Sequence, residues 1–137
     1  MLNEASHQLF SQQQYCITAN SNNMGYRLQA EALVLKEKIQ LLSFAVNKGT
    51  IQLLPSGQLI VLMSAHQTTG GYPRIAHVIN ASLPTLAQLA FNTNIQFKIV
   101  EQSEAEQANI HQQQYLHQLQ TISIFRLNEY FSQHKLH

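Results

Sequence analysis

The chain has 137 residues and a formal net charge of +1, and 45% of its residues are hydrophobic. A chain of this length forms one domain with a single core, and its composition excludes intrinsic disorder. Only 11% of the residues are charged, so the sequence lacks the basic surface that nucleic acid or an acidic membrane would require. We therefore expect neither nucleic acid nor a membrane among its partners.

Several kinds of chemistry are excluded by residue types that the sequence lacks. All seven carboxylate side chains are glutamates, so a Ser-His-Asp triad and an aspartate pair are both impossible. The lone Cys16 excludes an internal disulfide, and the histidine spacings match no common ligand set, so we expect no metal. There is no signal-peptide pattern and no apolar run long enough to cross a bilayer, which predicts a soluble cytoplasmic protein.

The region from about residue 14 to residue 100 has the pattern of short strands joined by turns. In "QYCITAN", Tyr15, Ile17 and Ala19 alternate with polar residues, which predicts a strand. Residues 19 to 30, "ANSNNMGYRLQA", favour a turn because Asn and Ser side chains bond to nearby backbone. This stretch also contains Arg27, one of only three arginines, so a ligand-binding role stays open beside the turn interpretation.

Four further elements complete this region. Residues 31 to 46 carry two candidate strands, which separate near Lys36–Glu37–Lys38. Residues 49 to 63, "GTIQLLPSGQLIVLM", predict a hairpin whose strands are joined by a Pro-Ser-Gly turn. The stretch "LPTLAQLAF" predicts a short helix with Pro84 in its first turn, and the alternation in "NIQFKIV" predicts a strand over 94 to 100.

The pattern becomes helical after Val100. Ser103 and Glu106 form a capping-box pattern, and apolar residues then recur at helical spacing. We expect a helix, broken near Thr121, that packs on the strands or on a partner. Strands followed by a helix predict a mainly β domain of the α+β class, of closed or sandwich type.

The stretch "LMSAHQTTGGYPRIAHVI", residues 62 to 79, holds two of the five glycines side by side. Adjacent glycines can turn successive backbone N–H groups toward one anion and let a ligand approach the backbone, although a turn of purely structural purpose stays an alternative. Arginine supplies the planar fork that pairs with carboxylate or phosphate. The predicted substrate-binding or anion-binding residues are Arg27, His66, Gln67, Thr68, Thr69, Gly70, Gly71, Tyr72 and Arg74.

Three motifs together carry a family resemblance. "SNNMGYRL", "GTIQ…PSGQ" and "HQTTGGYPRIAHVI…LPTLAQ" follow one another in the order and spacing of the allophanate hydrolase subunit two family. That family is also called the biotin-dependent carboxyltransferase or Kip-type kinase antagonist family. The resemblance covers residues 8 to about 107, leaving 108–137 as a helical Gln-rich tail. It implies a cyclophilin-like β-barrel followed by a C-terminal helix.

The resemblance also implies a function. Family members include the C-type component of ATP-dependent 5-oxoprolinase, which opens 5-oxo-L-proline to L-glutamate together with A-type and B-type components, so ATP is expected in the assembled complex. One alternative is a non-catalytic regulatory module that binds a kinase inhibitor resembling the B-type component. Another is a carboxyltransferase fragment that uses biotin and acts on urea-like amides.

The sequence departs from the family pattern in ways that bear on catalysis. Ala65 and Ser82 stand where the family usually has Asp. The chain resembles only the C-terminal part of full-length members, so a separate N-terminal half is expected as a partner beside the A-type and B-type proteins of 5-oxoprolinase. No residue is assigned a catalytic role on this basis.

Overall fold

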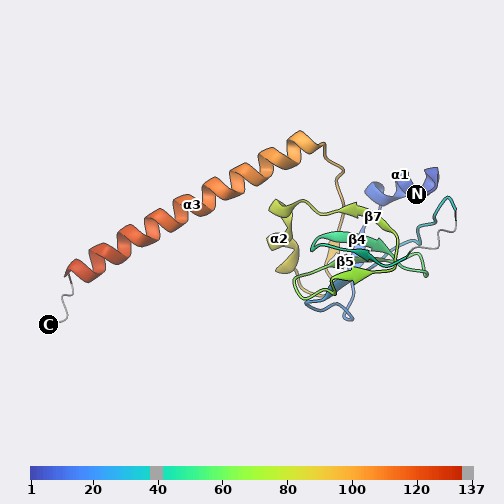
Figure 1. Cartoon of the computed structure of the whole chain (residues 1–137), viewed down its shortest axis with the longest axis horizontal. Coiled ribbons are helices and arrows are strands. Elements are labelled where there is room, and N and C mark those ends of the chain that lie inside the picture. The colour runs from blue at the N-terminus through green and yellow to red at the C-terminus, as the bar shows by residue number, and fades with distance from the viewer. Residues whose placement is uncertain (38–41, 134–137) are drawn as a thin grey trace. The chain divides into compact units, whose positions relative to one another are not determined.

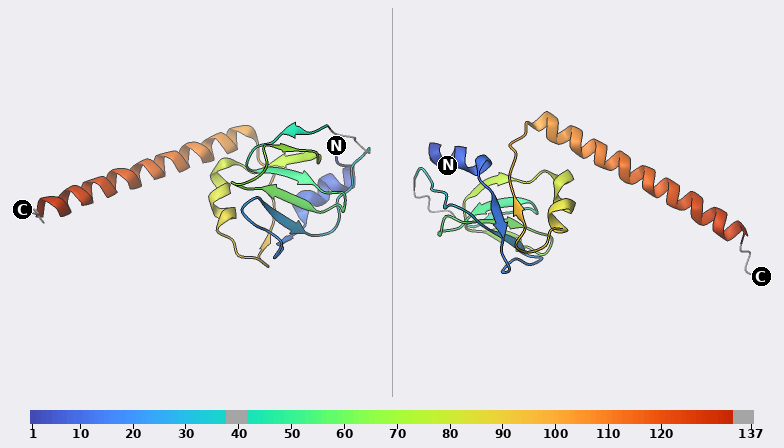
Figure 2. Two further views of the ribbon diagram at one scale, coloured as in Figure 1. Left: turned by 60° about the horizontal axis from the view of Figure 1, so that its bottom comes forward. Right: turned by 180° about the vertical axis from the view of Figure 1, so that it is seen from behind.

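The arrangement of strands and helices is described by a computed structural model, which covers residues 1–37 and 42–133 (Figures 1 and 2). The chain divides into a first unit, Met1–Ile99, and a second unit, Val100–His137. The elements of the first unit are α1 (Glu4–Gln12), β1 (Tyr15–Ile17), β2 (Gly25–Gln29), β3 (Phe44–Ala45), β4 (Thr50–Leu53), β5 (Leu59–Leu62), β6 (Thr69–Gly70), β7 (Arg74–His77), η1 (Asn80–Ser82), α2 (Leu83–Ala87) and β8 (Asn94–Ile95). The second unit holds α3 (Gln102–Gln133).

Six strands form an antiparallel sheet in the order β7-β4-β5-β2-β1-β8, and β3 pairs with β6 in a separate two-stranded sheet. Figure 1 shows β7, β4 and β5 side by side in this order. The predicted mainly β fold of the α+β class with a C-terminal helix is confirmed, and its larger sheet is antiparallel. Closure of the strands into a cyclophilin-like barrel stays a prediction.

The predicted hairpin is formed by β4 and β5. Its turn closes through a bond from Leu54 N to the Gln58 carbonyl oxygen at 2.8 Å and one from Gly57 N to the Leu54 carbonyl oxygen at 2.9 Å. Gly57 has φ +81°, a conformation that glycine adopts without steric cost. The glycine of the Pro-Ser-Gly motif therefore makes this turn possible.

The core lies on one face of the six-stranded sheet. Side chains alternate between faces along a strand, so Ile51 and Leu53 of β4 point into the core while Gln52 points to the other face. All four β4 residues are nevertheless buried, because both faces of this strand are covered. The buried core residues are Phe10, Tyr15, Ile17, Leu28, Leu33, Ile51, Leu53, Leu59, Val61, Met63 and Leu86.

The N-terminal helix α1 is an element that the sequence patterns did not reveal. The Asn3 side chain caps it by accepting a hydrogen bond from Ser6 N at 2.8 Å. Phe10 anchors it to the core, where its ring lies 5.1 Å from the ring of Phe97 and stacks on it. Helical periodicity over these nine residues is weak because only one large apolar side chain is fully buried.

The first strand predicted within residues 31 to 46 is not formed. Residues 32 to 36 instead run extended beside the N-terminus and contribute one isolated bridge, Leu2 to Leu35. Their backbone donors bond individually, as when Leu33 N bonds to the Gly57 carbonyl oxygen at 2.9 Å. The second predicted strand shortens to β3, and residues 38 to 41 lie outside the described residues.

The predictions for the remaining short elements are confirmed in part. α2 begins as predicted, with Pro84 in its first turn, where a missing N–H is tolerated. The last strand is shorter than predicted, because only Asn94–Ile95 pairs with β1. Beyond it, the Gln96 amide bonds to the Ser11 carbonyl oxygen at 2.9 Å, and Phe97 packs on Phe10 instead of extending a ladder.

The second unit consists of α3, and two predictions about it were wrong. The helix continues through Thr121, whose hydroxyl bonds to the His117 carbonyl oxygen at 3.0 Å within the helix. Ser103 lies inside the first turn, and the Glu106 carboxylate accepts from the Gln102 amide at 2.9 Å, so no Ser103 capping box forms. Among the described residues, no helix is apolar enough over sufficient length to span a bilayer.

Candidate functional site

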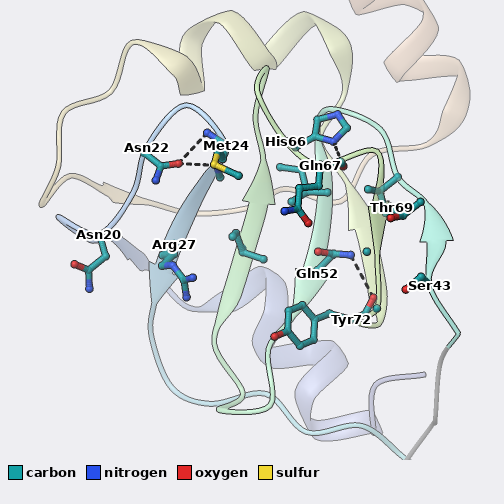
Figure 3. Close-up of a pocket in the computed structure, with 16 residues that line it drawn as sticks. Asn20, Asn22, Met24, Arg27, Ser43, Gln52, His66, Gln67, Thr69 and Tyr72 are labelled. Carbon is teal, nitrogen blue, oxygen red and sulfur yellow. Dashed lines mark hydrogen bonds between the residues drawn. The ribbon is translucent and has the colours of Figure 1, made fainter.

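A cleft of about 390 Å³ opens on the sheet face opposite the core (Figure 3). This volume lies within the range of small-molecule sites. Its lining residues come from β2, β4, β5 and β6, from the loops that precede β2 and follow β5 and β6, and from the positions on either side of β3. They are Asn20, Asn22, Met24, Gly25, Arg27, Ser43, Val46, Gln52, Ile60, Leu62, His66, Gln67, Thr69, Gly70, Gly71 and Tyr72.

Strand register brings Arg27 and Gln52 onto this face together. Ile60 on β5 pairs with Arg27 on β2 and with Gln52 on β4, and residues paired directly across antiparallel strands point to the same face. Gln52 thus lies in the middle of the cleft, with Arg27 to one side of it in Figure 3. A guanidinium and a carboxamide are held on rigid strands on either side of an aliphatic side chain.

Two loops that are far apart in the sequence meet at one end of the cleft. Ala65 N bonds to the Asn23 carbonyl oxygen at 2.8 Å, and Met63 N bonds to the Met24 carbonyl oxygen at 3.0 Å. The Asn22 side chain shapes the first loop by accepting from Met24 N at 2.9 Å. The two polar stretches noted in the sequence therefore form one site.

The adjacent glycines have different roles. Neither Gly70 nor Gly71 has a positive φ; among the described glycines, only Gly49 and Gly57 do. A Cβ on Gly70 would lie 2.6 Å from Nε2 of Gln52, so Gly70 permits close approach of this buried amide. A Cβ on Gly71 would have only Ser43 Oγ near it, at 4.0 Å, so Gly71 leaves space at the cleft wall.

Hydrogen bonds orient the polar side chains of the cleft. The Gln52 amide donates to the Tyr72 carbonyl oxygen at 3.4 Å, which joins the strand to the glycine loop. His66 Nδ1 lies 2.6 Å from the Gln67 carbonyl oxygen, so Nδ1 carries the proton in this contact and Nε2 is the remaining ring nitrogen. Both bonds appear as dashed lines in Figure 3.

The cleft has a positive electrostatic character. Arg27 is exposed and is the one arginine or lysine in the lining, which contains no carboxylate. No ion pair or hydrogen bond of its guanidinium occurs among residues 1–37 and 42–133. A small anion with further hydrogen-bonding groups is the ligand that such a lining can bind.

Seven of the nine sequence-predicted residues line the cleft, and two do not. The seven are Arg27, His66, Gln67, Thr69, Gly70, Gly71 and Tyr72. Thr68 instead uses its carbonyl oxygen to pair with Val46 N at 3.0 Å. The Arg74 guanidinium lies over the Phe44 ring, 5.4 Å from its centroid. Their binding roles stay predictions.

Gln52 is the principal lining residue that sequence reasoning missed. It is only 3% exposed, and it stands in "GTIQLL" between the core residues Ile51 and Leu53. A polar residue at the alternate position of an otherwise apolar strand was the available signal. Among the described residues, no three His, Cys, Asp or Glu side chains gather in a way that would hold a metal ion.

Both the fold and the motifs point to one class of protein. Residues 1–99 match the family described as the carboxyltransferase domain, subdomain A and B, and the chain therefore belongs to this family. The resemblance drawn from the motifs is confirmed. Among its relatives are the 5-oxoprolinase C subunits of Haemophilus influenzae, 43% identical over 109 residues, and of Escherichia coli, 42% identical over 115 residues.

The matches cover the chain and its relatives unequally. The two relatives align with 80% and 84% of this chain but with only 35% and 37% of their own lengths, so the chain spans about a third of each. The Kluyveromyces lactis urea amidolyase and urea carboxylase each superimpose on 77% of this chain with a TM-score of 0.72. This chain covers 7% and 10% of these structures at 20% identity, which shows a shared fold.

Proposed function

We propose that this chain is a component of a 5-oxoprolinase and that its cleft binds 5-oxo-L-proline. The exposed Arg27 guanidinium, in a lining without carboxylates, is the observation that carries the proposal. The name of the two relatives supports the choice of substrate. 5-Oxo-L-proline combines one carboxylate with one cyclic amide, and both features match groups in the cleft.

The cleft suits each end of this substrate. Arg27 pairs with the carboxylate through charge-assisted hydrogen bonds, which are stronger than neutral ones. The carboxamides of Asn22, Gln52 and Gln67 offer donors and acceptors to the lactam N–H and C=O. Because Gln52 is buried and bonded to the Tyr72 carbonyl oxygen, its amide is oriented before the substrate arrives.

Ring opening requires activation of a stable amide, which ATP supplies in the assembled enzyme. The cleft lining does not fit a magnesium nucleotide, because it contains no carboxylate to hold the metal ion. We propose that the nucleotide is held by the A-type and B-type partners. The role of this chain is then to bind and orient 5-oxo-L-proline for the reaction.

Reconstitution tests the assignment. The chain is combined with the A-type and B-type proteins, with and without the N-terminal two-thirds of a relative, and ATP-dependent release of glutamate from 5-oxo-L-proline is measured. We expect glutamate only with the full set. If partners bind without turnover, the chain is a regulatory module. If turnover of urea depends on a biotin carrier, it is a carboxyltransferase fragment.

Arg27→Ala tests the site itself, and Arg74→Ala tests whether the second predicted arginine, which does not line the cleft, also binds the substrate. A lost hydrogen bond to a charged group is worth about 1.5–3 kcal/mol, so we expect the affinity for 5-oxo-L-proline to fall by about tenfold or more with Arg27→Ala. Arg74→Ala is expected to change it by less than about twofold. Binding is measured by calorimetry on the reconstituted complex. Equal losses in both variants would contradict the assignment of the carboxylate to Arg27.

A further inference from the structure

Ile60 forms the part of the cleft floor that lies between Arg27 and Gln52. It is partly buried on β5, and it pairs with Arg27 on one neighbouring strand and with Gln52 on the other. Neighbouring strands lie about 4.8 Å apart, so the backbones of Arg27 and Gln52 are separated by about 10 Å, with Ile60 midway between them. A ligand that reaches from the Arg27 guanidinium to the Gln52 amide therefore passes over the Ile60 side chain.

The position of the Ile60 side chain depends on the absence of a side chain at Gly25. A Cβ on Gly25 would lie 2.6 Å from Cδ1 and 2.9 Å from Cγ1 of Ile60. Gly25 pairs with Leu62, so it is the diagonal neighbour of Ile60 on the same face of the sheet. The end of the Ile60 side chain thus lies against Gly25, and both residues line the cleft. Neither has a side-chain group that accepts a hydrogen bond.

The charges around Ile60 oppose a cationic group at this place. Arg27 is the one lysine or arginine among the described residues that line the cleft, and no Asp or Glu is among them. An ammonium group next to a carboxylate that is bound by Arg27 would lie near the guanidinium, which repels it. It would also exchange water for aliphatic surface, and burial of an unpaired charge is costly. An uncharged nitrogen avoids both penalties.

We propose that Ile60 is a specificity-determining residue, which makes the cleft select an uncharged lactam nitrogen over an α-ammonium group. This inference rests on the proposed function and deepens it. In 5-oxo-L-proline the nitrogen on the carbon that bears the carboxylate belongs to an amide and is uncharged. In L-glutamate and L-glutamine the nitrogen at this position is an ammonium group. The cleft therefore binds the closed ring and rejects open α-amino acids.

The same selectivity favours release of the product. Ring opening adds one water overall: the bond between the carbonyl carbon and the nitrogen breaks, the carbon gains the water oxygen to become a carboxylate, and the nitrogen gains both protons to become an ammonium. The new ammonium lies over Ile60 without an acceptor. The new carboxylate finds no second lysine or arginine among the described lining residues. The product is therefore held less tightly than the substrate.

Three ligands test this selectivity on the wild-type reconstituted complex without ATP. Calorimetry gives the affinity for 5-oxo-L-proline, and its displacement gives the affinities for L-glutamine and for glutaramate, which is glutamine without its amino group. We expect glutaramate to bind at least about tenfold more tightly than L-glutamine, because it lacks the charged group. Equal affinities for these two, with 5-oxo-L-proline still bound, would overturn this inference alone. A complex that does not bind 5-oxo-L-proline would overturn the proposed function as well.

Ile60→Asn and Ile60→Leu test the residue itself. Asn and Leu have nearly the same shape, but only Asn carries an oxygen that can accept a hydrogen bond from an ammonium. Ile60→Asn is expected to reduce the preference for glutaramate over L-glutamine by about fivefold or more, and Ile60→Leu by less than about twofold. An equal preference in the two variants would overturn the role of Ile60. Circular dichroism checks folding, and Ile60→Thr against Ile60→Val gives the same comparison if Ile60→Asn does not fold.

Discussion

β4 and α3 show two opposite ways of stabilising an apolar sequence. Every residue of β4 is buried, because β5 and β7 pair with its edges while the core covers one face and the loop around Gly70 and Tyr72 lies against the other. In α3 the backbone bonds are satisfied locally, and the large apolar side chains whose burial is described are exposed. Ile51 of β4 is 1% exposed and Ile124 of α3 is 52% exposed.

This contrast shows what constrains the choice of residue in each region: distant neighbours in β4 and local helix formation in α3. A residue of β4 contacts segments from across the first unit, so its identity is set by neighbours distant in sequence. Within the described part of its own unit, a residue of α3 has only that helix around it, so its identity is set mainly by local helical preference. We therefore expect matched substitutions in the two regions to differ strongly in their effect on stability.

The largest expected difference is between Ile51→Ala and Ile124→Ala. Removal of a buried Ile side chain costs about 2–5 kcal/mol of unfolding free energy, because transfer from water and an unfilled cavity both contribute. Ile124 is half exposed, so its truncation is expected to cost less than about 0.5 kcal/mol. Urea unfolding followed by tyrosine fluorescence measures both, and similar losses would invalidate the contrast.

The β4–β5 turn provides the next effect in size. Gly57→Ala is expected to lower the unfolding free energy by about 1–3 kcal/mol, because φ +81° strains a residue with a Cβ. That Cβ would also lie 2.6 Å from Cβ of Ala32 and 3.0 Å from the Leu33 carbonyl oxygen. Ser56→Ala in the same turn is the control, with an expected change below about 0.5 kcal/mol. A Gly57→Ala protein as stable as the parent would show that the turn relaxes freely.

The two neighbouring glycines of the cleft offer a smaller and more local comparison. Gly70→Ala must displace the Gln52 side chain, and we expect a loss of about 1 kcal/mol because overpacking and a disturbed hydrogen bond both contribute. Gly71→Ala has space for its Cβ and is expected to change stability by less than about 0.5 kcal/mol. Thermal unfolding of the pair checks this, and the reverse order would refute the role assigned to Gly70.

The smallest effect concerns Tyr15 and appears only at alkaline pH. Burial raises the pKa of the Tyr15 phenol above its ordinary value of 10.0, although the hydrogen bond from Gln13 opposes the shift. Above pH 10 the unfolded state therefore loses this proton before the folded state does, so the unfolding free energy falls as pH rises. Tyr15→Phe should remove this part of the pH dependence. An unchanged slope between pH 9 and 11 would contradict it.

Sequence patterns were most informative where the chemistry is local. The Pro-Ser-Gly turn and Pro84 in the first turn of α2 are both present as predicted. The two polar stretches were also recognised as the parts that would carry a site. By contrast, α1 was missed because its one deeply buried apolar residue, Phe10, gives no helical periodicity.

Tertiary contacts determined what the patterns left open in the cleft. Gln52 looked like an ordinary strand residue, and only the pairing of β4 with β5 shows that it shares a face with Arg27. Thr68 and Arg74 lie within the recognised motif but do not line the cleft. The Thr68 carbonyl oxygen pairs with Val46 N, and the Arg74 guanidinium lies over the Phe44 ring. Spacing in the chain cannot distinguish these cases.

The sequence by itself determined the family, the mainly β character and the loops that form the site, because each depends on local residue chemistry and motif order. Only the tertiary structure decided which polar residues meet in the cleft and why Gly70 must be glycine. These follow from register across strands, where the pairing of residues distant in sequence places Arg27 beside Gln52 and Gln52 against Gly70.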